Sequence, residues 1–357
     1  MKHLVIEAYS MEFPFSGVKE FMMHLGRGLV RRNNELRRHD IKLSFIVTPQ
    51  HKGCFGNDAN YIVMPRSLRF LLRRFYFPKV NLLYTPHQYS HLKNLPFVGK
   101  RLVTIHDINF IYTKTGRGYR RGIKRMKKRL RINDYLAFVS KFSMDDFDRN
   151  FTVDKPQRVI YNGVTDLTHA DATVSDEFKA RLPRKYFFHL SRLDANKNIR
   201  ALAEMMKLLP EYNIVIAGNW DYDPELLARI NAGEYPNIVP LHQISESEKA
   251  YLYKYCRAFM FPSLTEGFGL PPIEAMKCGK PVFLSTCTSL PEVGGDAAFY
   301  WPDFSPEAMA DVVHRGMHTI DTDPTLTSRI LANADRFTWE KCVDGYIDYF
   351  LSILESK

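Results

Sequence analysis

Short apolar runs alternate with longer amphipathic segments along the whole chain. The apolar runs are rich in β-branched and aromatic residues and are too short for buried helices, so they predict strands that are covered on both faces. Segments of helical length separate them, which is the pattern of strand–helix–strand units in parallel sheets. The sequence therefore predicts an α/β fold.

The predicted strands form two series. The first series lies at 3–8, 42–48, 81–84, 101–105, 135–139 and 158–161. The second lies at 186–190, 213–217, 237–241, 258–261, 281–285 and 297–300. Residues 165–185, between the series, are polar and poor in strand formers, which is typical of a linker. We expect two doubly wound domains, at 1–168 and 184–337, since 357 residues are too many for one ordinary core.

The C-terminal segment has a helical pattern. Apolar residues recur at Val343, Tyr346, Ile347 and Phe350, which places them on one face of a helix. Thr338 is a suitable N-cap for that helix. We therefore predict a final helix at about 338–357.

Charge is distributed unevenly over the chain. The formal net charge is +11, but residues 1–170 contain 31 Lys and Arg against 13 Asp and Glu, whereas the remaining 187 residues contain 19 against 26. A basic domain joined to a mildly acidic one suggests an anionic partner for the first domain, such as a membrane surface, a phosphate-rich acceptor or nucleic acid. A solvated basic surface explains the asymmetry equally well.

Much of the basic excess lies in the segment 114–131, which contains ten Lys and Arg around apolar Ile123, Met126 and Leu130. A helix with this spacing has a narrow apolar face and a cationic remainder, which suits anionic lipid head groups. RNA or a phosphate-bearing acceptor would use the same charges. The candidate membrane or acceptor contacts are Lys124, Arg125, Lys127 and Lys128.

The cysteines and the hydropathy pattern restrict the cellular setting. Five scattered cysteines without a Cys-x-x-Cys pair argue against a disulfide framework or a zinc site. No apolar run approaches the ~18 residues that span a bilayer, and the N-terminal apolar stretch ends at Glu7, too early for a signal peptide. We expect a cytoplasmic protein without a bound metal, whose membrane contact would be peripheral, on the inner face of the plasma membrane.

The segment 262–276 is the most informative for chemistry. It follows the predicted strand 258–261, contains Glu266, Gly267, Phe268, Gly269 and Leu270, and runs into a predicted helix that carries Glu274. Ligands of open α/β sheets bind beyond the carboxyl ends of strands, where a glycine turn at a helix N-terminus offers backbone N–H groups to an anion. The two carboxylates suit sugar hydroxyls. Helix capping and first-turn dipole stabilisation explain them about equally well.

A second cluster follows the predicted strand 186–190. Arg192 and Lys197 lie at that strand's carboxyl end, where an Arg fork and a Lys point charge could together stabilise a departing diphosphate. Such a pair would make a metal ion unnecessary. A solvated loop is the more common role of any single pair of this kind.

The first half of the chain contributes weaker candidates. Gly17 lies between the first predicted strand and a helix, where a glycine permits close backbone approach to a ligand. His106 and Asp107 end the predicted strand 101–105, which places an imidazole and a carboxylate at the same edge of the sheet. A single histidine is more often a structural residue than a catalytic one.

Together these segments resemble glycosyltransferase family 4, whose retaining, GT-B-fold members make bacterial surface polysaccharides. The match is carried by Glu266 and Glu274, with Gly267-Phe268-Gly269-Leu270 between them, and by Arg192 and Lys197. Further landmarks are Ser140-Lys141-Phe142-Ser143, Ile160-Tyr161-Asn162-Gly163-Val164 and Phe337-Thr338-Trp339-Glu340. The resemblance implies two Rossmann-like domains facing across a cleft, with the final helix packing back on the first domain.

The resemblance also implies roles for the candidate residues. Glu266 and the amides of Gly267, Phe268, Gly269 and Leu270 would bind the transferred sugar and the phosphates, while Glu274 would bind the ribose. Arg192 and Lys197 would hold the diphosphate. Gly17 corresponds to the family's N-terminal glycine loop, and His106 and Asp107 to its His-Asp pair near the transferred sugar. The implied catalytic set is His106, Arg192, Lys197 and Glu266.

The implied reaction is transfer of a hexose from GDP-mannose or a UDP-sugar to a glycan or lipid-linked acceptor, in polysaccharide or lipopolysaccharide biosynthesis. No cofactor beyond the nucleotide sugar, no metal and no nucleic acid partner are expected. Two departures from the family pattern matter: Ser16 replaces a common glycine, and His242 stands where relatives often have glycine. The alternatives are a sugar-nucleotide epimerase or hydrolase, and a non-catalytic cationic scaffold that binds membranes or RNA.

Overall fold

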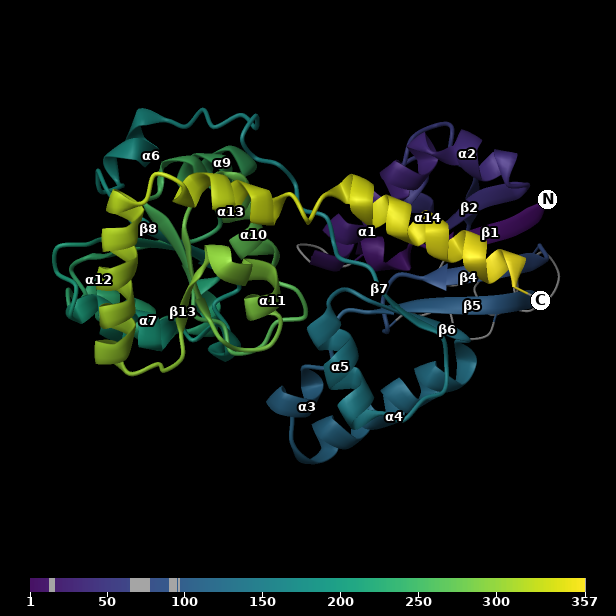
Figure 1. Cartoon of the computed structure of the whole chain (residues 1–357), viewed down its shortest axis with the longest axis horizontal. Helices are drawn as coiled ribbons and strands as arrows, with labels where there is room; N and C mark the ends of the chain where they lie inside the picture. Colours follow the sequence, from purple (N-terminus) through teal and green to yellow (C-terminus); the bar gives the residue numbers. More distant parts are fainter. Residues whose placement is uncertain (13–16, 65–77, 90–94, 96, 357) are drawn as a thin grey trace. The chain divides into compact units, whose positions relative to one another are not determined.

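The computed structural model describes residues 1–12, 17–64, 78–89, 95 and 97–356 (Figure 1). The chain divides into two compact units, one formed by Met1–Gly163 with Phe337–Lys357 and the other by Val164–Arg336. The sequence predicts a later boundary, with a linker at 165–185. In the structure these residues belong to the second unit and include helix α6 (Asp176–Ala180), which Ser175 caps by accepting a hydrogen bond from the Phe178 amide.

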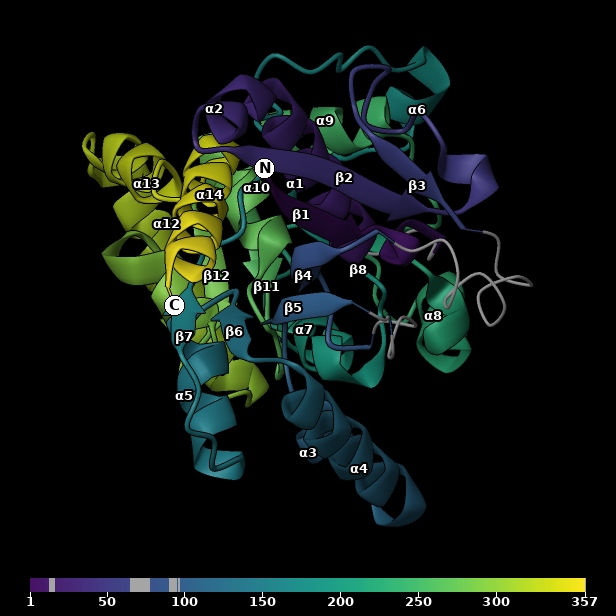
Figure 2. The ribbon, with the colours of Figure 1, turned by 90° about the vertical axis from the view of Figure 1, so that its right-hand side faces the viewer.

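The described part of the first unit contains a seven-stranded parallel sheet with strand order β3-β2-β1-β4-β5-β6-β7. Figure 2 shows β2, β1, β4 and β5 lying side by side in this order. The strands are β1 (Lys2–Glu7), β2 (Ile41–Val47), β3 (Tyr61–Val63), β4 (Val80–Thr85), β5 (Val98–Ile105), β6 (Tyr135–Phe138) and β7 (Gln157–Val159). The six strands predicted for this half are confirmed, and β3 is an additional edge strand.

The helices of the first unit cover both faces of this sheet. Those of the N-terminal part are α1 (Gly17–Arg31), α2 (Asn33–Arg38), α3 (Phe110–Thr113), α4 (Gly116–Ile132) and α5 (Lys141–Asn150). Short 3-10 turns lie at η1 (Tyr9–Glu12) and η2 (Pro49–His51).

The last helix, α14 (Trp339–Glu355), packs against α1 in the first unit. Its apolar face at Val343, Tyr346, Ile347 and Phe350 is buried, and Thr338 caps it by accepting a hydrogen bond from the Lys341 amide. A Cβ atom at Gly28 of α1 would lie 2.4 Å from Val343 Cγ2, so glycine is needed there for the two helices to approach.

The second unit contains a six-stranded parallel sheet among the residues described, with strand order β10-β9-β8-β11-β12-β13. The strands are β8 (Phe187–Ser191), β9 (Ile214–Gly218), β10 (Ile238–Leu241), β11 (Ala258–Phe261), β12 (Val282–Ser285) and β13 (Phe299–Trp301). All six correspond to predicted strands. The helices are α7 (Ile199–Lys207), α8 (Pro224–Asn231), α9 (Glu246–Tyr255), α10 (Leu270–Lys277), α11 (Leu290–Gly294), α12 (Pro306–Thr322) and α13 (Leu326–Ala334), with turns η3 (Ala195–Lys197), η4 (Trp220–Tyr222) and η5 (Gly295–Ala297).

The strand order indicates where the second sheet can bind a ligand. In the second unit the chain proceeds from β8 outward to β9 and β10, and then returns to β11 on the other side of β8. The loops that follow β8 and β11 therefore diverge at a topological switch point, where open α/β sheets bind ligands. The segments that carry Arg192, Lys197 and Glu266 are these two loops.

Candidate functional site

A buried histidine of β8 holds the loop that follows this strand. His189 is fully buried, and its Nδ1–H donates to the Met260 carbonyl at 2.7 Å, while Nε2 accepts from the Ser191 hydroxyl at 2.8 Å. Burial lowers the pKa of His189 to about 3, helped by the charge of Lys197 and opposed by the bond to Met260. The imidazole therefore stays neutral near pH 7 and serves to orient the loop.

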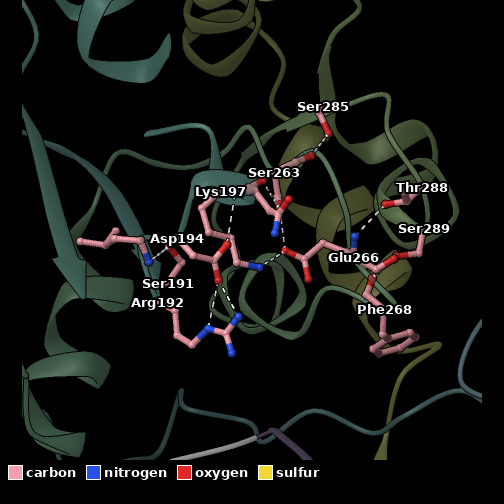
Figure 3. A network of polar contacts seen from close by, with 12 residues as sticks. Ser191, Arg192, Asp194, Lys197, Ser263, Glu266, Phe268, Ser285, Thr288 and Ser289 are labelled. Atoms are coloured by element: carbon pink, nitrogen blue, oxygen red, sulfur yellow. Dashed lines mark hydrogen bonds and ion pairs between the residues drawn. The ribbon is translucent and has the colours of Figure 1, made fainter. Parts of the chain in front are cut away.

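Lys197 and Glu266 form an ion pair at the centre of the site (Figure 3). The Lys197 ammonium lies 2.5 Å from Glu266 Oε1, and the two side chains are 16% and 15% exposed. The Ser263 hydroxyl donates to the same carboxylate oxygen at 2.7 Å. The β8 and β11 loops thus bring together two charged groups that lie 69 residues apart.

Hydrogen bonds to the backbone fix the β11 loop. The Leu264 amide donates to the Asn196 carbonyl at 2.7 Å, and the Glu266 amide donates to Thr288 Oγ1 at 3.0 Å. The Ser289 hydroxyl donates to the Phe268 carbonyl at 2.8 Å. These contacts come from the loops after β8 and β12, and they fix the β11 loop that carries Glu266.

The β11 loop enters α10 through a glycine with left-handed backbone geometry. Gly269 has φ +108° and ψ 61° and is the residue before α10. The positive φ disfavours any residue with a side chain. A Cβ there would also lie 3.0 Å from Leu290 Cδ2. Since Pro271 and Pro272 have no N–H, Leu270 is the one residue among the first three of α10 whose amide can donate to an anion.

Arg192 is paired with Asp194 in the β8 loop. Its Nε and Nη2 both donate to Asp194 Oδ2, at 3.1 and 2.5 Å, and the arginine side chain is 69% exposed. The bond to Asp194 raises the pKa of Arg192. Burial acts to raise the pKa of Asp194, but the bond from Arg192 and the charges of Lys197 and Arg192 outweigh it and lower that pKa. Arg192 therefore lies beside the Lys197–Glu266 pair without contacting it.

Glu274 lies within α10 and has its own partners in α9. Lys249 Nζ is 2.7 Å from Glu274 Oε1, and the Tyr253 hydroxyl donates to Oε2 at 2.9 Å. The Glu274 side chain is 5% exposed. Burial, and to a smaller extent the Glu274 carboxylate, raises the pKa of Tyr253 well above its usual value, so the phenol remains a hydrogen-bond donor.

In the first unit, His106 follows β5 and is held by its neighbours. Its Nε2–H donates to the Pro86 carbonyl at 2.8 Å, and its backbone amide donates to Gln88 Oε1 at 3.1 Å. Burial lowers the pKa of His106 to about 4, although the bond to Pro86 opposes the change. With Nε2 as the donor, the neutral ring presents Nδ1 as an acceptor, and no described residue bonds to Nδ1.

Asp107 and Gly17 occupy the two other predicted positions of the first unit. Asp107 Oδ1 accepts the Asn109 amide at 2.9 Å, and its backbone carbonyl accepts Gln88 Nε2 at 2.9 Å. Gly17 is exposed and is the first residue of α1. Ser16, the other half of the predicted N-terminal loop motif, lies outside the described residues.

Helix α4 has the predicted amphipathic character, but its apolar face is covered. Met126 and Leu130 are buried in a cluster with Phe110 and Phe147. The four candidate contacts are exposed, namely Lys124, Arg125, Lys127 and Lys128. Arg129 differs from the predicted cationic surface because it is 6% exposed, and burial lowers its pKa. Within the described part of the chain, none of the helices is long and apolar enough to span a bilayer.

A family model described as glycosyl transferases group 1 matches residues 172–322, which include every strand and most helices of the second unit. We refer to this matched part of the chain as the group 1 domain. O-antigen chain mannosyltransferase B of Escherichia coli is 32% identical to this chain over 172 residues, which are 46% of this chain and 45% of that protein. The chain therefore spans less than half the length of that relative.

Other comparisons extend beyond the group 1 domain. O-antigen chain mannosyltransferase RfbU of Salmonella typhimurium is 29% identical over 242 residues, 66% of this chain and 63% of that protein. The crystal structure of Anabaena HepE in complex with UDP and glucose matches with a TM-score of 0.75 at 17% identity, and covers 99% of this chain and 100% of HepE. The fold of the chain is GT-B.

The group 1 domain contains site residues that the sequence did not single out. Ser263 and Thr288 hold Glu266, while Lys249 and Tyr253 hold Glu274. Lys249 and Tyr253 are four residues apart on a predicted helix, so the sequence indicates that they share a face. It does not indicate which residue that face contacts. Among the described residues, no group of three or more His, Cys, Asp and Glu side chains is arranged to hold a metal ion.

Proposed function

We propose that the chain is a retaining glycosyltransferase that transfers a hexose from a nucleotide-diphosphate sugar to a glycan or lipid-linked acceptor. The observation that carries the proposal is the Lys197–Glu266 pair at the switch point of the second sheet, beside the glycine turn that opens α10. A cation for the diphosphate, a carboxylate for sugar hydroxyls and the Leu270 amide for a phosphate oxygen converge there.

The charges of the site suit the departure of a nucleoside diphosphate. Lys197, which faces Glu266 in the structure, would compensate the negative charge that builds on the diphosphate as the glycosidic bond breaks. Arg192 is exposed and would reach the same group by exchanging its contact with Asp194 for one with phosphate oxygens. With two cations available from the chain, we propose a metal-independent reaction.

We propose front-face displacement as the mechanism. The bond from the anomeric carbon to the diphosphate oxygen breaks while the acceptor oxygen bonds to the same face of that carbon. The proton of the acceptor hydroxyl passes to an oxygen of the leaving diphosphate, so the reaction needs no nucleophile from the chain. In the first unit, neutral His106 is the candidate to accept a hydrogen bond from a hydroxyl of the transferred sugar on Nδ1, with Asp107 beside it.

For the sugar nucleotide, GDP-mannose is our first candidate because both relatives described above are O-antigen mannosyltransferases. The HepE structure contains UDP and glucose, so a UDP-sugar is the second candidate. The names of the relatives also favour an acceptor in cell-surface polysaccharide or lipopolysaccharide synthesis. The exposed cations of α4 would hold such an acceptor, or the membrane that carries it, at the inner face of the plasma membrane.

A thermal-shift screen tests this function. Purified protein is heated with GDP-mannose, UDP-glucose, ADP-glucose or dTDP-glucose in buffer containing EDTA, since a ligand bound only by the folded state raises Tm. We expect one nucleotide series to raise Tm, and Glu266→Gln and Lys197→Met to reduce that shift. Release of the nucleotide only when a glycan acceptor is added identifies transfer, whereas release without acceptor would favour a hydrolase. No shift with any nucleotide sugar would contradict the proposal.

A further inference from the structure

Helix α9 presents two side chains to the carboxylate of Glu274. Lys249 Nζ lies 2.7 Å from Oε1, and the Tyr253 hydroxyl lies 2.9 Å from Oε2. The Lys249 side chain is 16% exposed and that of Glu274 is 5% exposed. Each carboxylate oxygen thus has its own hydrogen-bond donor on α9, one charged and one neutral, in surroundings that are largely closed to water.

The local sequence sets the register of both helices that form this contact. Helix α9 begins with a capping box, in which Ser245 Oγ accepts the Glu248 amide and Glu248 accepts the Ser245 amide. Helix α10 begins directly after the left-handed Gly269. Since each helix has a fixed starting residue, the faces that carry Lys249 and Glu274 are fixed as well.

Stability alone does not account for charged groups at this position. An apolar pair of similar size generally stabilises two packed helices as well as a buried ion pair does, because the ions lose their hydration. Residues beside these two on each helix are apolar and buried, among them Ala250 and Leu252 of α9 and Ile273 and Met276 of α10. The charged contact involves Glu274, to which the family resemblance gives the ribose.

The geometry of the contact suits a role in orienting Glu274. A carboxylate oxygen can accept two hydrogen bonds, and Lys249 and Tyr253 place one donor on each oxygen of Glu274. A charged, oriented carboxylate binds hydroxyl groups more strongly than a protonated one, since charge-assisted hydrogen bonds are about twice as strong as neutral ones. The vicinal hydroxyls of a ribose are the ligand that a fixed carboxylate binds through both oxygens.

We propose that Lys249 is a positioning residue, which holds the Glu274 carboxylate charged and oriented toward the ribose 2′- and 3′-hydroxyls of the sugar nucleotide. The inference rests on the proposed function, because it needs a sugar nucleotide as the ligand, and it takes Glu274 as the ribose ligand that the family resemblance implies. Lys249 acts through Glu274 and does not itself contact the reacting atoms. Without its charge, the buried carboxylate would gain a proton or turn toward water, and ribose recognition would weaken.

The test compares ribose with deoxyribose in matched variants. Binding of GDP and UDP to the wild-type protein by titration calorimetry first identifies the nucleotide that is recognised. The affinities of that nucleotide and of its 2′,3′-dideoxy analogue are then measured for wild type, Lys249→Met, Lys249→Arg and Glu274→Gln. Lys254→Met is the matched control, because Lys254 is an exposed lysine of the same helix. The Tm of each variant shows whether it folds.

We expect Lys249→Met to weaken the ribonucleotide about tenfold while changing the dideoxy analogue little, so that the preference for ribose shrinks. The preference for ribose should be largely restored in Lys249→Arg and intact in Lys254→Met. In Lys249→Met, KM for the sugar nucleotide should rise while kcat stays nearly unchanged. Two results would overturn the role of Lys249 while keeping that of Glu274. One is an equal loss of affinity for the ribonucleotide and the dideoxy analogue in Lys249→Met. The other is an unchanged preference for ribose in Lys249→Met when Glu274→Gln abolishes that preference. If Glu274→Gln keeps the preference, the ribose assignment itself fails and the role of Lys249 with it.

Discussion

Lys197 Nζ and Glu266 Oε1 lie 2.5 Å apart at the carboxyl ends of two adjacent parallel strands, β8 and β11. The ion pair is mostly buried, with the Ser263 hydroxyl on the same carboxylate oxygen. The two charges compensate each other in this arrangement, although the proposed reaction uses them for different groups of the substrate. Binding of a diphosphate sugar would therefore exchange one charge-assisted contact for two, with phosphate at Lys197 and hydroxyls at Glu266.

This exchange predicts different effects on activity and on stability. Lys197→Met removes the cation and leaves Glu266 unpaired, so we expect turnover to fall at least about 100-fold and the protein to lose about 2 kcal/mol of unfolding free energy. The double variant Lys197→Met/Glu266→Gln should regain most of that stability, because no unpaired charge remains, but should stay inactive. Urea unfolding and a nucleotide-release assay measure the two quantities. Turnover near the wild-type value in Lys197→Met would remove this lysine from the catalytic set.

A second prediction concerns the glycine that opens α10. Gly269→Ala places a side chain at φ +108° and 3.0 Å from Leu290 Cδ2. We therefore expect the unfolding free energy to fall by about 1 to 2 kcal/mol and the Leu270 amide at the start of α10 to shift, which weakens nucleotide binding. Gly233→Ala is the control, since Gly233 also has positive φ, at +84°, but has open space around it and lies away from the site. It should lose stability and keep nucleotide affinity. Equal effects of the two variants on affinity would contradict a special role for the Gly269 turn.

The sequence predicted the fold well because most strands are buried on both faces. Strands such as β1 and β11 are nearly continuous apolar runs, and such runs are visible without any knowledge of their partners. The one strand in the described residues that was missed, β3, has three residues that are half-buried or exposed at the sheet edge. An edge strand of this length has no apolar period long enough to detect.

The candidate site was predictable as a set of loops but not as a set of contacts. Glu266 and Lys197 could each be placed at a strand end from the βαβ pattern, whereas the adjacency of β8 and β11 and the Arg192–Asp194 pair could not. Lys249 could not be connected to Glu274, because the facing of α9 and α10 is a property of tertiary packing. The low pKa of His106 likewise results from burial by neighbours that the sequence does not identify.

Acid should destabilise the second unit through His189. Burial lowers the folded-state pKa of this histidine to about 3, below its unfolded value near 6.5, so between these values the unfolded chain binds a proton that the folded chain does not. The stabilisation is complete above pH 6.5 and is lost as the pH falls toward the folded pKa, by at most about 3 kcal/mol near pH 4. Unfolding measured by calorimetry from pH 7 to pH 4 checks this.

The variant His189→Gln provides the comparison for this pH dependence. Its stability should fall less steeply between pH 6.5 and pH 4 than that of the wild type, because glutamine binds no proton in either state. His318→Gln is the control, since His318 is exposed on α12 and should leave the slope unchanged. A slope in His189→Gln as steep as in the wild type would show that other groups cause the acid sensitivity.

The covered apolar face of α4 makes a specific prediction about membranes. Since Met126 and Leu130 pack inside the first unit, α4 would bind lipid through exposed charges at the surface rather than by insertion. We expect the protein to sediment with vesicles that contain anionic phosphatidylglycerol, not with neutral phosphatidylcholine vesicles, and to be released as salt is raised. Substitution of Lys124, Lys127 and Lys128 by glutamine should weaken binding about 100-fold, at about 1 kcal/mol for each charge. The control is a triple variant of the second unit, in which glutamine replaces the exposed Arg181, Lys185 and Lys254. It removes the same total charge and should change vesicle binding little. Equal losses of binding in the two triple variants would show that net charge, and not α4, governs the association.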